Sequence, residues 1–200
     1  MNRAEMRRRL TAEDWRERLG AQYAVSVWLA GDFETAFALV LECAATDDPW
    51  LNTGAVAPFG MKDFCRSHPD RLPRIMAVLE DQLTNRADPV RRNHGPYALG
   101  LLARTHPAAV RPYLEEWARR DDEQTRWNVA SAFTQATGRH QPDLALRVLA
   151  MLVDDGRGYV RRAVARALAN VSRHHPRKVT AFLSPTGEGR ALAALMRDKR

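Results

Sequence analysis

The chain repeats one short pattern at steps of 35 residues, as Val90-Arg91-Arg92-Asn93, Thr125-Arg126-Trp127-Asn128 and Val160-Arg161-Arg162-Ala163. A fixed period of this length is typical of a solenoid, in which each helical pair is too small to bury its own apolar face and stacks on its neighbours. The repeat therefore predicts an all-α chain of stacked helical pairs.

Apolar residues follow each of these stretches at helical spacing. The last stretch opens the series Val160, Val164, Ala167, Leu168 and Val171. Steps of 35 residues lead back to Thr125, Val129, Ala132, Phe133 and Ala136, and then to Val90, His94, Tyr97, Ala98 and Leu101. We expect three equivalent helices with one buried stripe each. Gly95-Pro96 predicts that the first of them is broken there or begins at Pro96.

Partner helices lie between these three. Two of them are marked by Val110, Tyr113, Leu114 and Trp117, and by Leu144, Val148, Leu149 and Leu152. Prolines at 69, 107, 142 and 176 stand near helix starts, where a missing N–H costs nothing. Aspartates in the turns, such as Asp48 and Asp122, are expected to cap the helix that follows.

The rest of the chain extends this pattern less strictly. Residues 12–30 and 33–45 read as another helical pair, in which Trp15 and Trp28 look structural, whereas 48–66 is the least regular segment. We expect one domain over residues 1–200, with strict repeats in 88–183 and a C-terminal capping helix in 184–200. About five helical pairs then form one right-handed α-solenoid superhelix.

Composition narrows the class of protein. At 45% hydrophobic and 28% charged residues, 200 residues fit one soluble domain with a sizeable core. No stretch resembles a membrane span or a signal peptide, so we expect no membrane contact and a cytoplasmic location. Cys43 and Cys65 make neither a disulfide framework nor a metal site and read as buried thiols. No metal-ligand spacing, phosphate loop or nucleophile elbow occurs, so neither metal nor cofactor is expected.

The formal charge of +7 comes almost entirely from arginine, because the chain has only three lysines. Arginine presents a planar fork that suits phosphate, and a basic excess favours an anionic partner such as nucleic acid. A bias toward alanine, arginine and leucine in the composition could produce much of the same charge without any ligand.

One face of the repeat combines arginines with an aromatic ring. Arg162, Arg166 and Arg173 lie opposite the apolar stripe of their helix, and Arg92, Trp127 and Arg162 hold one position in successive repeats. Cations beside an exposed indole suit a phosphate backbone with a sugar or base against the ring. Alternatively, Trp127 covers the next repeat and the arginines are solvated. The predicted nucleic-acid contacts are Arg91, Arg92, Arg126, Trp127, Arg161, Arg162, Arg166 and Arg173.

The chain also resembles a known family. The similarity is carried by Tyr159-Val160-Arg161-Arg162-Ala163-Val164-Ala165 with Leu168, Val171, His175-Pro176 and Val179. This pattern resembles the HEAT-like repeats of the AlkC and AlkD alkylpurine DNA glycosylases, and AlkC is the more similar. The resemblance implies HEAT-like helical pairs, a basic concave face that binds double-stranded DNA, and removal of N3- or N7-alkylated purines.

The catalytic pattern of that family is not preserved. Where AlkC-like sequences carry acidic residues, this chain has Asn52-Thr53 and Asn93-His94-Gly95. A neutral side chain cannot stabilise the charge that develops on the sugar as a carboxylate does. Asn93, His94 and Trp127 are the candidates that remain for a catalytic role. Three hypotheses stay open: a nucleic-acid-binding relative without activity, an active glycosylase, and a scaffold for an acidic protein.

Overall fold

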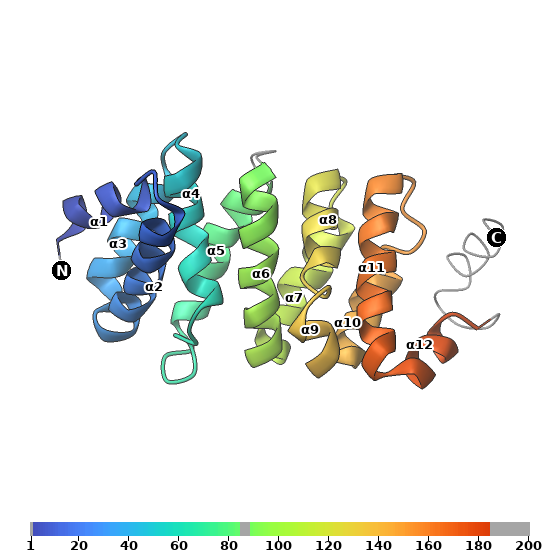
Figure 1. The fold of residues 1–200 in the computed structure, drawn as a ribbon. Coiled ribbons are helices and arrows are strands. Elements are labelled where there is room, and N and C mark those ends of the chain that lie inside the picture. The colour runs from blue at the N-terminus through green and yellow to red at the C-terminus, as the bar shows by residue number, and fades with distance from the viewer. Residues whose placement is uncertain (1, 85–88, 185–200) are drawn as a thin grey trace. The chain divides into compact units, whose positions relative to one another are not determined.

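The computed structural model is helical, with no strand in its described residues, 2–84 and 89–184 (Figure 1). For residues 84 and 89–94 it describes the backbone alone. The all-α, helical-repeat prediction is confirmed. The chain divides into two compact units, Met1–Leu99 and Gly100–Arg200. The capping helix expected in 184–200 lies outside the described residues, which end at Ser184.

The first unit contains the expected helical pair and an additional helix before it. Its elements are α1 (Arg3–Leu10), α2 (Trp15–Gly31), α3 (Phe33–Ala44), α4 (Pro49–Val56), the 3₁₀ turn η1 (Ala57–Gly60), α5 (Arg71–Thr84) and the start of α6 (Pro89–Thr105). The helix α1 was not expected, because only Met6 and Leu10 give it an apolar face. Leu10 packs where Gly54 of α4 has no side chain.

The segment expected to be least regular, 48–66, lies inside the first unit; its residues 49–60 are helical, whereas 61–66 form no helix. All residues from 51 to 60 are buried, although Gly54, Pro58 and Gly60 interrupt the apolar pattern. Asp48 caps α4, since its side chain accepts hydrogen bonds from the Trp50 and Leu51 N–H groups. Small residues therefore serve close packing here.

The second unit consists of two layers of helices. Layer A is formed by α7 (Pro107–Arg119), α10 (Pro142–Ala150) and α12 (Pro176–Phe182), in which α10 contacts both others. Layer B is formed by α8 (Glu123–Ser131), α9 (Ala136–His140), α11 (Gly158–His174) and the last residues of α6, 100–105. In Figure 1, α8 and α11 run side by side. Each layer A helix begins at its expected proline, and Asp122 caps α8 as expected.

The predicted stripe on α11 is confirmed. Val160, Val164, Ala167, Leu168 and Val171 are all buried. On α7 the core residues are Val110, Leu114 and Trp117, and on α10 they include Val148 and Leu149. Trp117 is fully buried, as expected.

The equivalent stripe one repeat earlier is interrupted. Thr125, Val129, Ala132 and Phe133 are buried, but α8 ends at Ser131 and α9 begins at the exposed Ala136. The cause is a pair of hydrogen bonds from the Asn170 amide on α11 to the Phe133 and Gln135 carbonyls, at 3.0 and 2.6 Å. These carbonyls turn toward a side chain of the next repeat instead of continuing one helix.

The helix α6 differs from the expectation in two ways. It runs through Pro96 without a break. Tyr97, expected in the core, is exposed, and the buried residues after it are Ala98, Leu99, Leu102 and Ala103. Gly100 allows the end of α6 to approach the Ala132 backbone closely, because a Cβ there would lie 2.7 Å from the Ala132 carbonyl oxygen. Trp28 is buried as expected, whereas Trp15 is exposed.

Both cysteines are buried reduced thiols, as expected. Burial raises the pKa of Cys43 and of Cys65 to about 11. Within residues 2–84 and 89–184, no helix is long and apolar enough to cross a membrane.

We predict that Asn170→Ala destabilises the second unit by about 2–4 kcal/mol, because it leaves two carbonyl groups without their partner. The measurement is urea unfolding followed by circular dichroism. The control is Ala169→Ser on the exposed side of α11, for which we expect a change within about 0.5 kcal/mol. Equal stabilities of the two variants would contradict this role for Asn170.

Candidate nucleic-acid interface

The outer side of α11 carries a row of arginines. The row consists of Arg162, Arg166 and Arg173, which are exposed on the side of α11 away from its buried stripe. Their side chains therefore point outward, as the sequence predicted. No carboxylate among the described residues lies within ion-pair distance of any of the three. This row is therefore a positively charged surface whose charge the surrounding fold does not neutralise.

A second group of basic side chains lies where successive layer B helices end. Arg104, Arg139 and His174 follow one another at steps of 35 residues, in the last turns of α6, α9 and α11. Two side chains join these ends across repeats. The Gln141 amide donates to the Arg104 carbonyl at 3.0 Å, and His175 Nε2 lies 2.7 Å from the Arg139 carbonyl. Sequence analysis missed this group, although its 35-residue recurrence was a usable signal.

His140 belongs to the same group. Its Nε2 lies 3.2 Å from Arg139 Nε, which donates to it. Partial loss of hydration lowers the pKa of His140, and repulsion by nearby cations adds to this effect. Those cations are, in descending order, Arg139, Arg104 and His174. The pKa of the His140 imidazole is therefore lower than that of a free histidine side chain, through lost hydration first and nearby positive charge second.

The arginines at the other end of layer B are paired within the fold. Arg126 Nε lies 2.5 Å from Asp155 Oδ2, and this contact is an ion pair without hydrogen-bond alignment. Arg161 donates to the Asp155 carbonyl, and Arg157 pairs with Asp121. Arg126 and Arg161, both predicted phosphate contacts, thus hold the loop before α11. Within the described residues, layer B thus has ion-paired arginines where helices begin, whereas Arg104 and Arg139 at the helix ends have no carboxylate partner.

Trp127 lies against the next repeat. Its ring stacks on Tyr159 with centroids 5.3 Å apart and planes 10° from parallel, and both residues are half-buried. Arg162 follows Tyr159 by one turn of α11. The stacked pair forms an aromatic surface beside the arginine row, and contact of Trp127 with a sugar or base stays a prediction.

The remaining candidates are residues 91–94 and the pair Asn52 and Thr53. The side chains of Arg91, Arg92, Asn93 and His94 lie outside the described part of the chain. Asn52 and Thr53 are buried, at 0% and 2% exposure. The Asn52 amide donates to the Thr46 and Asp48 carbonyls, both at 2.8 Å, and the Thr53 hydroxyl donates to the Pro49 carbonyl at 2.9 Å. These two side chains support the start of α4.

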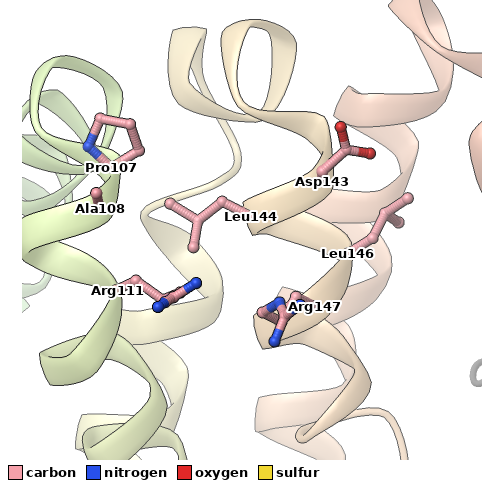
Figure 2. A pocket seen from close by; sticks show the side chains of 7 residues that line it. All are labelled: Pro107, Ala108, Arg111, Asp143, Leu144, Leu146 and Arg147. Atoms are coloured by element: carbon pink, nitrogen blue, oxygen red, sulfur yellow. The ribbon is translucent and has the colours of Figure 1, made fainter.

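A cavity in the second unit lies in layer A, between α7 and α10. Its volume is about 630 Å³. Figure 2 shows Arg111 of α7 and Arg147 of α10 beside it, with Leu144 between them. Both arginines lie 4.0 Å from the same carboxylate, that of Glu115. Two cations with one carboxylate would suit an acidic protein segment. No group of His, Cys, Asp or Glu within the described ranges could hold a metal ion.

Comparison with known proteins identifies the family. Residues 95–199, just over half of the chain, match the family described as DNA alkylation repair enzyme. The chain belongs to the DNA alkylation repair family. The match covers the layer B helices with the arginine row. No curated protein matches the chain at a significant level.

Two solved structures are similar to this chain. A structure from work on TOG–tubulin binding specificity aligns with a TM-score of 0.51 and 15% identity, covering 98% of this chain and 82% of its own. A designed armadillo repeat protein aligns with a TM-score of 0.38 and 16% identity, covering 96% and 97%. At 15% identity the first likeness concerns the fold alone.

We predict that duplex DNA raises the pKa of His140, because nearby phosphates favour the imidazolium. Proton NMR titration of its ring, with and without a DNA duplex, measures this shift. In the free protein, Arg139→Gln should also raise the pKa by removing one cation. An unchanged His140 titration at saturating duplex would place the DNA elsewhere.

Proposed function

We propose that this member of the DNA alkylation repair family binds double-stranded DNA through layer B of its second unit. The observation that carries the proposal is the row Arg162, Arg166 and Arg173, exposed on α11 with no ion-pair partner in the described residues. Arg104 and Arg139 extend the positive surface across neighbouring helices. Arginine forks held on rigid helices suit phosphate oxygens, which position a duplex without reading its sequence.

The paired arginines contribute indirectly. Arg126 fixes Asp155, which in turn accepts the Arg157 N–H at 2.8 Å and holds the loop that leads into α11. The start of α11 sets the direction in which Arg162 and Arg166 project. Loss of Arg126 would therefore disturb the surface without removing a phosphate contact.

We predict that Arg162→Gln with Arg166→Gln weakens duplex binding about 5- to 30-fold, if each exposed ion pair contributes about 0.5–1 kcal/mol. Removing two phosphate contacts should also lower the slope of log affinity against log salt by about 2. Fluorescence anisotropy with a labelled duplex at several salt concentrations gives both quantities.

The matched control is Arg111→Gln with Arg147→Gln, which makes the same change of charge in layer A. Duplex affinity should be nearly unchanged in this control. Equal losses in the two double variants would mean that net charge, not layer B, drives binding. Loss in the control alone would favour the groove between α7 and α10.

We also propose that DNA binding is not coupled to base excision. The resemblance places an acidic residue at Asn52-Thr53, and both side chains there are neutral, buried and hydrogen-bonded to the backbone. They can neither approach a substrate nor supply negative charge to a sugar that is becoming positive. The DNA-binding surface would then serve recognition or protection of DNA.

We predict no release of N3-methyladenine or N7-methylguanine above the spontaneous rate when the folded protein is incubated with methylated duplex. The measurement is chromatography of the free bases, with an active alkylpurine glycosylase as positive control. Release that depends on protein concentration would establish an active enzyme and reject this part of the proposal.

A further inference from the structure

The helix α2 in the first unit exposes an apolar stripe that the proposed DNA contact does not use. Trp15, Leu19 and Tyr23 recur every four residues on one face and are 59%, 48% and 54% exposed. The other face of the helix is buried through Ala21, Val25 and Leu29. The core of the unit is thus complete without the exposed stripe.

The stripe forms one side of a groove with a volume of about 660 Å³. Met61, directly after η1, and Tyr97 of α6 line it as well. The Tyr97 ring is 47% exposed and lies against Gly60, where a Cβ would be 2.4 Å from its Cδ1. Gly60 therefore leaves the space that the ring occupies beside the groove. Three aromatic rings from two helices line one hollow.

Cations accompany the rings. The Arg16 guanidinium lies 5.3 Å from the Trp15 ring centroid, and Lys62 Nζ lies 5.6 Å from the Tyr23 ring centroid. No ion pair joins Arg16 or Lys62 to a carboxylate among the described residues. An anionic ligand with planar groups can therefore contact both charges and stack on the rings.

We propose that this groove binds single-stranded DNA, with unpaired bases stacked on Trp15, Tyr23 and Tyr97 and phosphates beside Arg16 and Lys62. Exposed rings with cations beside two of them suit a single strand, whose bases can stack on the rings while its phosphates lie near the charges. A duplex keeps its bases stacked inside and cannot use the rings in this way. The choice of DNA over RNA rests on the proposed function, whereas the groove itself lies on the first unit and uses none of the α11 arginines.

The test is fluorescence anisotropy of the full chain with labelled oligo(dT) of about 12 nucleotides, within the range of about 4–16 that one single-strand-binding fold covers. Trp15→Ala with Tyr23→Ala should weaken oligo(dT) binding at least about 30-fold, because it removes two stacking surfaces. Both residues are exposed, so the variant should keep the circular dichroism spectrum and thermal midpoint of the parent. Trp50→Ala, an exposed tryptophan of α4 outside the groove, should bind as the parent does.

A second variant tests the charges without removing any ring. Arg16→Gln with Lys62→Gln should lower the salt slope for oligo(dT) by about 1.4, since each contact with a single strand contributes about 0.7. Duplex binding through α11 should persist in both groove variants. A negative result with oligo(dT) therefore rejects the single-strand proposal alone, whereas absence of duplex binding by the parent protein rejects the proposed function.

Three results would overturn the proposal. The first is equal oligo(dT) affinity in the parent and in the Trp15 and Tyr23 variant. The second is tighter binding of oligo(rU) than of oligo(dT) of the same length. The third concerns a second probe, a synthetic acidic amphipathic helix. If binding of this helix requires Trp15 and Tyr23 while binding of oligo(dT) does not, the groove is a protein-docking site.

Discussion

The surface of the second unit depends on hydrogen bonds that run from side chains of one repeat to the backbone of the previous one. Asn170 binds two carbonyls of the turn between α8 and α9, and the Thr137 hydroxyl donates to the Gly100 carbonyl at 2.6 Å. Gln141 and His175 make the same kind of contact at the ends of layer B helices. Apolar packing alone leaves stacked helices some freedom to slide, whereas these directional bonds hold each helix at one height relative to its neighbour. Equivalent positions in successive repeats therefore become neighbours in space.

That registration explains why the charges form a surface. Carboxylates in the loops before layer B helices are used for caps and for pairs with Arg126 and Arg157. The arginines farther along α11 have no such partner in the described residues. Each cation contributes little by itself in water, but several held in fixed positions act together on a polyanion. An arginine in a last turn also interacts favourably with the helix dipole, so the fold tolerates Arg139 at the end of α9.

The sequence predicted the features that follow from periodicity. The 35-residue step located α11, its five buried residues and the outward row of arginines, because helix geometry converts spacing directly into facing. It did not predict the break between α8 and α9, which depends on the Asn170 amide one repeat away. It also placed Tyr97 in the core, since spacing does not reveal the room that Gly60 leaves beside that ring. Asn52 was read as a missing acid, whereas its burial and its bonds to the Thr46 and Asp48 carbonyls appear only in three dimensions.

Direct footprinting of arginines tests the central claim, that DNA lies on layer B of the second unit. The protein is treated with phenylglyoxal with and without a DNA duplex, and modified arginines are located by mass spectrometry. The account predicts protection of Arg139, Arg162, Arg166 and Arg173, while Arg111 and Arg147 of layer A remain reactive. Protection of Arg111 and Arg147 with continued reactivity of the α11 arginines would contradict it.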